Sequence, residues 1–246
     1  MRLEGWSLRR RSAARHRPMT FEVKICGLKA EAPLDAALDA GADLVGFVFF
    51  PRSPRHISLE DARLLGARVR NRAAKVALSV DADDAALDAI VAALSPDLLQ
   101  LHGSESPARV AQVKARYGLP VAKVIPVERQ ADLRAIETYA AVADRLMFDA
   151  RAPKDATRPG GLGKPFDWDL LSHVDLPNGF MLSGGLNAAN VAEALQTTRA
   201  TGVDVSSGVE LAPGEKDADM IAAFIRAARA AAAALRGYKT AFASPA

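Results

Sequence analysis

The sequence predicts a single-domain α/β protein with the architecture of a (β/α)8 TIM barrel. Short apolar runs of strand length alternate with helix-type segments eight times between Phe21 and Arg236. No long polar linker interrupts this alternation, so nothing marks a second domain. An open, doubly wound sheet is the alternative fold, but it would place a G-x-G-x-x-G turn after the first strand, where the chain reads KICGLK.

The first strand, helix and second strand form one βαβ unit. Glu22–Cys26 (EVKIC) has the length and β-branched content of a strand, and Gly27 directly after it is a stop signal. Alanines at helical spacing predict a helix over residues 30–40, and a second apolar run follows at 44–50. The chain's only cysteine, Cys26, therefore lies where a strand opens into a loop.

The later elements repeat this pattern with their own start signals. Ser58 with Asp61 three residues on is typical of a capping box, Pro107 suits a first helical turn, and Asn187 is a helix-capping residue. The Gly- and Pro-rich stretch 150–165 is too long for a simple connector, which indicates a functional loop. Further strands are expected at 75–80, 98–101, 121–127, 146–148, 180–182 and 203–205, and further helices at 58–71, 83–93, 107–117, 132–143, 167–172, 187–198 and 217–235.

Positive charge is concentrated at the start of the chain. The 246 residues carry a formal net charge of +3, but residues 1–18 contain six arginines and one acid and account for +5 of it. The remaining body is mildly acidic and has no basic stripe that would indicate nucleic-acid binding. We expect residues 1–18 to be a disordered basic leader or the result of an upstream start codon, residues 19–236 to form the barrel, and residues 237–246 to be a disordered tail. An RNA-binding leader is the alternative, and it would give salt-dependent binding that is lost when the leader is removed.

Cysteine, histidine and apolar content limit the class of protein further. A single cysteine excludes an internal disulfide and a Cys-rich zinc site, which favours a reducing compartment, and we expect the cytoplasm. Four scattered histidines do not favour a metal centre. No apolar run approaches the about 20 residues that span a bilayer, so we expect no membrane association. The arginine-rich start lacks the apolar region of a secretory signal, although it would also suit an organellar transit peptide.

The candidate catalytic residues are those that end the predicted strands, because barrels of this class carry their sites at the carboxyl ends of the strands. Cys26 ends the first strand and Asp149 ends the sixth, on opposite rims of the barrel. A thiol and a carboxyl placed in this way would face two sides of one substrate as an acid/base pair. Each has a structural alternative, since Cys26 would also suit an inert buried thiol and Asp149 a cap for the following loop.

Two glycine-bearing turns predict a phosphate site. One follows the seventh strand and the other the eighth, and each is expected to open a helix whose N-terminus attracts an anion. Barrels commonly bind phosphate at these two strands, although either turn alone could serve only to reverse the chain. The residues concerned are Gly184, Gly185, Ser206, Ser207 and Gly208.

Two further side chains end strands or follow them closely. Arg55 lies in the loop after the second strand, where a guanidinium would suit a carboxylate through bidentate hydrogen bonds, or would be simply solvated. His102 ends the fourth strand, either as a site residue or as a satisfied structural histidine.

Taken together, these residues resemble those of the phosphoribosylanthranilate isomerase family. The resemblance extends from Val23 to about Phe224 and implies the TIM barrel fold and a cofactor-free Amadori rearrangement in tryptophan biosynthesis. The substrate would be N-(5-phosphoribosyl)anthranilate and the product 1-(2-carboxyphenylamino)-1-deoxy-D-ribulose 5-phosphate. The motifs that carry it are KICGL (24–28), GADLVGFVF (41–49), SPR (53–55), QLHG (100–103), Phe148-Asp149, GGLGKPFDW (160–168), SGGL (183–186) and DVSSGVE (204–210).

The same resemblance implies a role for each matching residue. Asp149 would be the general acid that protonates the furanose ring oxygen, and Cys26 the general base that removes the C2′ proton. Near neutral pH this requires thiolate character at Cys26 and a proton on Asp149. Arg55 would hold the anthranilate carboxylate and His102 would lie near the anthranilate ring. The phosphate would be held by the backbone of Gly184, Gly185, Ser206, Ser207 and Gly208.

Three departures from the family pattern affect details only. Leu162 stands in GGLGK where many members carry threonine, so a hydroxyl contact there is not expected, and Ser183 stands where alanine is common. The arginine-rich leader has no counterpart in the family's core.

Two other classes of function remain open at this stage. A metal-dependent pentose-phosphate epimerase would require converging His and Asp ligands, and too few histidines end strands for that; loss of activity to EDTA would favour it. A non-catalytic phospho-ligand binder on the same barrel would have no reason to keep the Cys26 and Asp149 pair. We expect a monomer, because the helices show no exposed apolar stripe.

Overall fold

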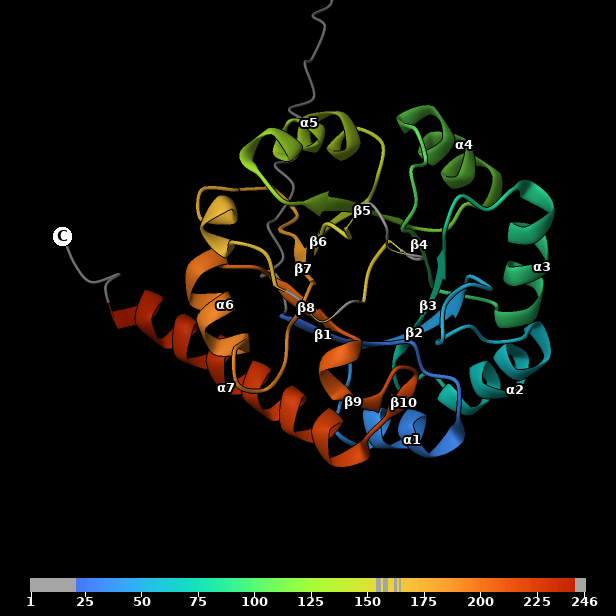
Figure 1. Ribbon diagram of the computed structural model, residues 1–246, viewed down its shortest axis with the longest axis horizontal. Helices are drawn as coiled ribbons and strands as arrows, with labels where there is room; N and C mark the ends of the chain where they lie inside the picture. The colour runs from blue at the N-terminus through green and yellow to red at the C-terminus, as the bar shows by residue number, and fades with distance from the viewer. Residues whose placement is uncertain (1–20, 154–155, 157–158, 162, 164, 242–246) are drawn as a thin grey trace, which may run out of the picture.

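The protein is a closed barrel of eight parallel strands surrounded by helices, as the sequence predicts (Figure 1). The computed structural model describes residues 21–153, 156, 159–161, 163 and 165–241, so the predictions for residues 1–18, Leu162 and residues 242–246 lie outside the described residues. Each strand pairs with the next in chain order, and β8 pairs with β1 to close the ring. The barrel strands are β1 Glu22–Cys26, β2 Leu44–Phe49, β3 Ala74–Ser79, β4 Leu98–Leu101, β5 Val121–Val127, β6 Arg145–Ala150, β7 Met181–Leu182 and β8 Gly202–Val205.

The helices follow the strands with most of the predicted start signals in place. Ser58 and Ser106 precede helices and accept hydrogen bonds from backbone N–H groups of the first turn, as N-cap residues do. None of the helices in the described part of the chain is long and apolar enough to cross a membrane. The α-helices are α1 Glu31–Asp39, α2 Leu59–Val69, α3 Asp84–Leu94, α4 Pro107–Tyr117, α5 Ala135–Ala140, α6 Val191–Thr198 and α7 Ala218–Ala241.

Four predicted helices differ from the structure. The helix expected at 132–143 is a 3-10 turn, η1 Gln130–Arg134, followed by the short α5, and the one expected at 167–172 is a 3-10 turn only, η2 Trp168–Leu171. Asn187 does not cap α6 directly, because its side chain accepts hydrogen bonds from Ala189 and Asn190 and forms a separate turn first. The backbone of α7 continues to Ala241, beyond the predicted end at residue 235.

The segment after β8 is the largest departure from prediction. The turn at 206–208 opens only a 3-10 turn, η3 Ser207–Val209, and not the long helix. A small antiparallel hairpin then follows, β9 Glu210–Ala212 and β10 Glu215–Lys216, before α7 begins at residue 218. Figure 1 labels this hairpin separately from the eight barrel strands. These strands are too short and polar for a period-2 pattern to be visible in the sequence.

Alternate residues of each strand face two different cores. Val23 and Ile25 of β1 point outward and pack in the main apolar core beneath the helices. Cys26 points inward and packs with Val48 and Leu78 inside the barrel. Because side chains alternate along a strand, Lys24 shares the inward face of β1 with Cys26.

Candidate active site

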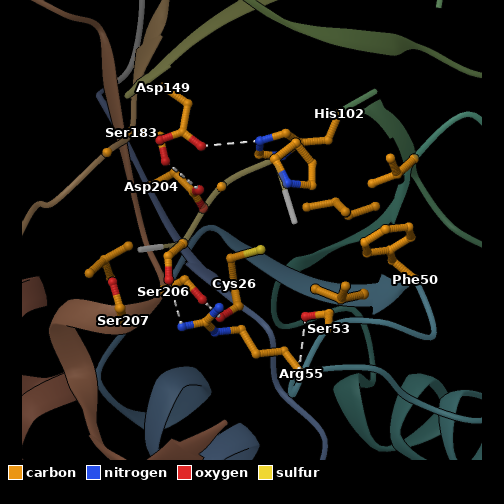
Figure 2. A pocket seen from close by; sticks show the side chains of 18 of the residues that line it. Cys26, Phe50, Ser53, Arg55, His102, Asp149, Ser183, Asp204, Ser206 and Ser207 are labelled. Atoms are coloured by element: carbon orange, nitrogen blue, oxygen red, sulfur yellow. Dashed lines mark hydrogen bonds and ion pairs between the residues drawn. The ribbon is translucent and has the colours of Figure 1, made fainter. Parts of the chain in front are cut away.

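One pocket at the carboxyl ends of the strands collects the predicted site residues (Figure 2). It encloses about 640 Å³ of space, including part that is open to solvent, and one wall is apolar, formed by Val48, Phe50, Leu78 and Val80. This is the end of the barrel at which sites of this fold lie. The predicted residues that line the pocket are Cys26, Arg55, His102, Asp149, Gly184, Gly185, Ser206 and Ser207.

Cys26 is the last residue of β1 and points into the pocket, where only 4% of its surface is exposed. Burial raises the pKa of its thiol, while the nearby Lys24 ammonium acts in the opposite direction. The larger of the two effects is burial, which disfavours the thiolate that the role implied by the family resemblance requires. The sequence did not show how completely the barrel buries the sulfur.

A buried ion pair lies directly below Cys26 inside the barrel. Lys24 Nζ donates a hydrogen bond to Asp204 Oδ1 at 2.8 Å, and both residues are almost completely buried. The hydroxyl of Ser183 donates to the other oxygen, Asp204 Oδ2, at 3.1 Å. The carboxylate of Asp204 and the ammonium of Lys24 are thus each other's charge partners in the buried interior of the barrel.

Asp149 lies at the other side of the pocket in contact with His102 (Figure 2). Asp149 Oδ2 is 3.1 Å from His102 Nε2, and its Oδ1 accepts a hydrogen bond from the backbone N–H of Ala150. The buried Gln100 places its amide nitrogen 3.3 Å from His102 Nδ1. With the amide in this assigned orientation, His102 Nδ1 accepts from Gln100 and His102 Nε2 faces Asp149 Oδ2. The Oδ1 contact is to Ala150, the last residue of β6, so capping of the following loop by Asp149 stays a prediction.

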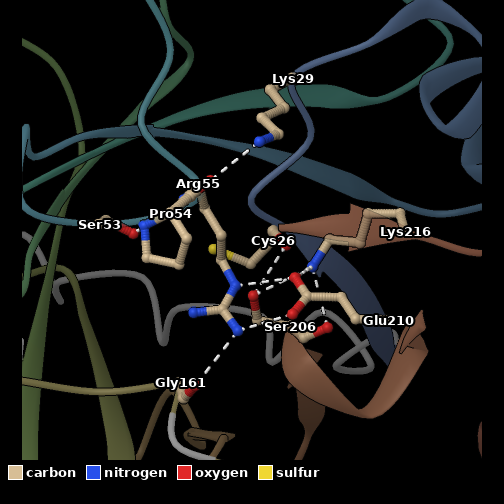
Figure 3. Close-up of polar contacts among 9 residues, drawn as sticks. All are labelled: Cys26, Lys29, Ser53, Pro54, Arg55, Gly161, Ser206, Glu210 and Lys216. Carbon is tan, nitrogen blue, oxygen red and sulfur yellow. Dashed lines mark hydrogen bonds and ion pairs between the residues drawn. The ribbon is translucent and has the colours of Figure 1, made fainter. Parts of the chain in front are cut away.

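Arg55 is buried and already paired, which the sequence did not predict (Figure 3). Its Nε and Nη2 donate to the two oxygens of Glu210, both at 2.8 Å, and Nη2 also donates to the carbonyl of Gly161. Lys216 donates to Glu210 Oε1 at 2.6 Å and to the hydroxyl of Ser206. The guanidinium is thus held rigidly by the hairpin, and its Nη1 edge is the one that does not face Glu210.

The charges of this cluster set the ionisation of its members. Burial alone would raise the pKa of Glu210, but hydrogen bonds from Arg55 and the charge of Lys216 lower it overall. Burial lowers the pKa of Lys216, and Glu210 opposes that shift. Glu210 is therefore ionised near neutral pH and holds Arg55 in one orientation.

The two predicted phosphate turns lie against each other. Gly184 and Gly185 both have positive φ, 90° and 68°, which glycine adopts without strain. Gly208 does not line the pocket; a Cβ on it would lie 1.9 Å from the carbonyl oxygen of Leu186, so this glycine is required for close packing of the two turns. Gly208 thus has a packing role in the structure, and its contact with phosphate stays a prediction.

Five residues of the site were not identified from the sequence. Lys24, Gln100, Asp204 and Glu210 lie within the motifs that resemble the family, and Lys216 lies outside them. Period-2 spacing from Cys26 and from Ser206 would have placed Lys24 and Asp204 on the inward face. Nothing in the sequence signals the Glu210 contact. In the described part of the chain no three His, Cys, Asp or Glu side chains converge as metal ligands would.

Comparisons with known proteins agree on one family. Residues 23–227 match the family model described as N-(5′-phosphoribosyl)anthranilate (PRA) isomerase. The chain is 66% identical over 212 residues to the N-(5′-phosphoribosyl)anthranilate isomerase of Bradyrhizobium diazoefficiens, covering 86% of this chain and 95% of that one. It is 65% identical to the Rhodopseudomonas palustris protein of the same name, covering 87% of this chain and all of the relative.

Solved structures give the same result. The crystal structure of phosphoribosyl anthranilate isomerase from Thermotoga maritima matches with a TM-score of 0.78 and 34% identity, covering 86% of this chain and 100% of that chain. A second isomerase structure, in complex with reduced 1-(o-carboxyphenylamino)-1-deoxyribulose 5-phosphate, matches with a TM-score of 0.73 and 32% identity, over 86% and 100% of the two chains.

Proposed function

The chain belongs to the N-(5′-phosphoribosyl)anthranilate isomerase family, and from this premise we propose that Cys26 is the general base and Asp149 the general acid of its reaction. It is an isomerase of tryptophan biosynthesis that converts N-(5-phosphoribosyl)anthranilate into 1-(2-carboxyphenylamino)-1-deoxyribulose 5-phosphate. The single observation that supports the two roles best is that this thiol and this carboxyl, from β1 and β6, line one pocket.

The proposed reaction moves two protons in sequence. Asp149 gives a proton to the furanose ring oxygen, the bond from that oxygen to C1′ breaks, and a Schiff base forms. The thiolate of Cys26 then takes the proton from C2′, and the electron pair left behind forms the enol-amine. Tautomerisation of the enol-amine gives the ketone, so the overall change is an isomerisation with no net gain or loss of atoms.

The high pKa of Cys26 is compatible with this role. A thiolate whose pKa lies above its ordinary value is a stronger base towards a carbon-bound proton, although a smaller fraction is ionised at neutral pH. The proton of the resting thiol leaves to solvent before the C2′ proton is taken. Activity should therefore rise with pH on the alkaline side of neutrality until the thiol is fully ionised.

The remaining pocket groups suit the rest of the substrate. The apolar wall beside Phe50 is suited to an aromatic ring, and His102 lies between that wall and Asp149. We assign the anthranilate carboxylate to the Nη1 edge of Arg55, because Glu210 already occupies the opposite edge. The phosphate is assigned to the turns that carry Gly184, Gly185, Ser206, Ser207 and Gly208.

The test is an activity assay with substrate generated in place from anthranilate and phosphoribosyl pyrophosphate, followed by its loss of fluorescence. Cys26→Ala and Asp149→Asn should each lower kcat by about 100-fold or more, the scale of acid/base residues. Asp144→Asn is the matched control: its carboxylate lies just before β6 and pairs with Lys114, outside the pocket. It should keep wild-type activity.

Two results would contradict the proposal. Activity that survives both Cys26→Ala and Asp149→Asn would discard these residues as base and acid. A wild-type protein that leaves the fluorescence unchanged would favour the phospho-ligand binder instead.

Three further expectations accompany the proposed function. We propose a cytoplasmic location, a monomer, and a leader at residues 1–18 that the barrel does not need. Removal of the leader should leave kcat/KM unchanged, and sedimentation at assay concentration should give the mass of one chain.

A further inference from the structure

Two buried polar residues of the barrel interior, Lys24 and Asp204, form a pair that the proposed reaction does not use. Lys24 has no exposed surface and Asp204 has 4%, and their Cα atoms are register partners in the β1–β8 pair that closes the barrel. The ammonium group is hydrogen-bonded to Asp204, which Ser183 also contacts. A buried ion pair contributes little to stability compared with apolar residues of similar volume, so its presence here needs another reason.

Lys24 lies next to the thiol of Cys26. Both side chains point inward from β1, two positions apart. Gly46, on the neighbouring strand β2, lies close to both groups. A Cβ atom built on Gly46 would lie 3.1 Å from Cys26 Sγ and 3.1 Å from Lys24 Nζ. A positive charge thus stands within a few ångströms of the sulfur, with no side chain from β2 between them.

We infer that Lys24 is a positioning residue that stabilises the thiolate of Cys26, and that Asp204 anchors its ammonium group in the barrel interior. The inference deepens the proposed function and rests on Cys26 being the base. When the thiol loses its proton, the sulfur and the ammonium form an ion pair. When Cys26 takes the C2′ proton, the sulfur becomes neutral and the Lys24 ammonium stays paired with Asp204.

The other charged groups around Cys26 do not provide the same support. Lys216 of β10 acts on the thiol from the rim, but its ammonium is committed to Glu210 and to Ser206. Arg55, from the loop after β2, is likewise committed to Glu210. Asp204 of β8 acts against the thiolate, since two negative charges repel.

The ionisation of Lys24 agrees with this role. Burial alone would lower its pKa, but the Asp204 carboxylate and the Cys26 sulfur raise it to about 12. The ammonium is therefore charged throughout the range in which the enzyme works. Lys24 also lowers the pKa of Cys26 by its charge and by hydrogen bonding, against the dominant effect of burial.

The experiment is a direct titration of the thiol without substrate. Cys26 is the only cysteine, so the difference in ultraviolet absorbance between each variant and the same protein carrying Cys26→Ala reports its thiolate. Lys24→Met should move the titration midpoint up by about one pH unit or more, roughly tenfold less thiolate at a given pH. Asp204→Asn should move it down, because it removes the repelling carboxylate.

Two comparisons keep the test decisive if Lys24→Met alone does not fold with Asp204 unpaired. The double variant Lys24→Met with Asp204→Asn leaves neither charge of the pair buried alone. Its thiol titration midpoint should be higher than that of Asp204→Asn by itself. The control is Lys123→Met with Glu105→Gln, which removes an equally buried ion pair with a 2.9 Å contact on the outward face of β5. It should leave the midpoint unchanged.

An unchanged or lowered midpoint in the Lys24 variants would overturn the inference, and so would an equal shift in the Lys123 control. Failure of the proposed function is distinguishable, because it is read from activity. If Cys26→Ala keeps full activity, the base assignment fails whatever the titration gives; if Cys26→Ala is inactive and the midpoint does not move, only the role of Lys24 fails.

Discussion

The two sides of the pocket are built from different interactions. On the thiol side, formed by Lys24, Cys26, Asp204 and Ser206, ionised groups are paired with each other, and the Arg55, Glu210 and Lys216 cluster lies beside them. On the carboxyl side, formed by Gln100, His102 and Asp149, the Gln100 amide contacts the His102 imidazole, which in turn contacts the Asp149 carboxyl group. The partners found for Asp149 in the described part of the chain include no lysine or arginine.

This difference matches the chemistry proposed for each side. A residue that must become an anion before it acts gains from a fixed cation nearby, because burial otherwise disfavours the charged form. A residue that must deliver a proton would be kept ionised by such a cation. Fixed charges on the thiol side, and hydrogen-bonding groups on the Asp149 side, are consistent with the base and the acid that we propose.

The largest effect is expected on the charged side, from Glu210→Gln. This substitution leaves Arg55 and Lys216 buried without their carboxylate, and breaking a buried ion pair costs about 3–5 kcal/mol of unfolding free energy. Because Arg55 is then less well oriented, KM should rise more than kcat falls. Urea unfolding and steady-state kinetics measure the two effects.

The control for this variant is Glu215→Gln, an exposed glutamate on the same hairpin. It should change neither stability nor KM. A Glu210→Gln protein as stable as wild type would mean that the charged cluster does not hold this side of the pocket together.

A pH dependence of stability should come from the same glutamate. The pKa of Glu210 is lower in the folded than in the unfolded state, so its ion pairs contribute fully above the unfolded value of about 4.3. That contribution is lost as pH falls through the lower folded value. Unfolding free energy should therefore fall more steeply below about pH 4.3 in wild type than in Glu210→Gln; parallel curves would contradict this.

A smaller effect is expected on the neutral side, from Gln100→Leu. Gln100 Oε1 is buried and has no hydrogen-bond partner in the described structure, so leucine should change stability by less than about 1 kcal/mol. His102 Nδ1 loses its partner, and kcat should fall by about tenfold, equivalent to about 1.4 kcal/mol. The thiol titration should not move.

The exposed Gln112→Leu on α4 serves as the control for this substitution and should keep wild-type kcat. If Gln100→Leu shifted the titration midpoint of Cys26 as much as Lys24→Met is expected to, the carboxyl side would also control the ionisation of the thiol. The two sides would then not act independently.

An effect of similar size, on stability alone, is expected from Ser183→Ala on the thiol side. It removes the hydroxyl that donates to Asp204 and should lower unfolding free energy by about 1.5 kcal/mol, the size of a hydrogen bond to a charged group. Ser172→Ala, which removes an exposed hydroxyl bonded to a backbone carbonyl, should cost less and provides the reference. Equal losses in both would indicate that Ser183 adds nothing to the anchoring of Asp204.

Most of the barrel and the position of the pocket were determined by the sequence alone. Strand and helix periodicity with local stop signals placed β1, β4, β5 and α4 at the observed residues, because these patterns depend on neighbours a few positions apart. Strand ends meet at one rim in this fold, so eight of the nine predicted residues line one pocket. Gly208 is the exception, since its constraint comes from packing against Leu186.

Only the tertiary structure decided the charge environment of that pocket. Lys24 and Asp204 are 180 positions apart and meet because β8 closes on β1; Arg55 and Glu210 are 155 positions apart and meet through a hairpin too short to leave a periodic signal. The pKa of Cys26 depends on burial and on the charges of Lys24 and Asp204, and this environment arises only when the ring closes. Local pattern therefore determines where a thiol lies along a strand, while long-range closure determines its ionisation.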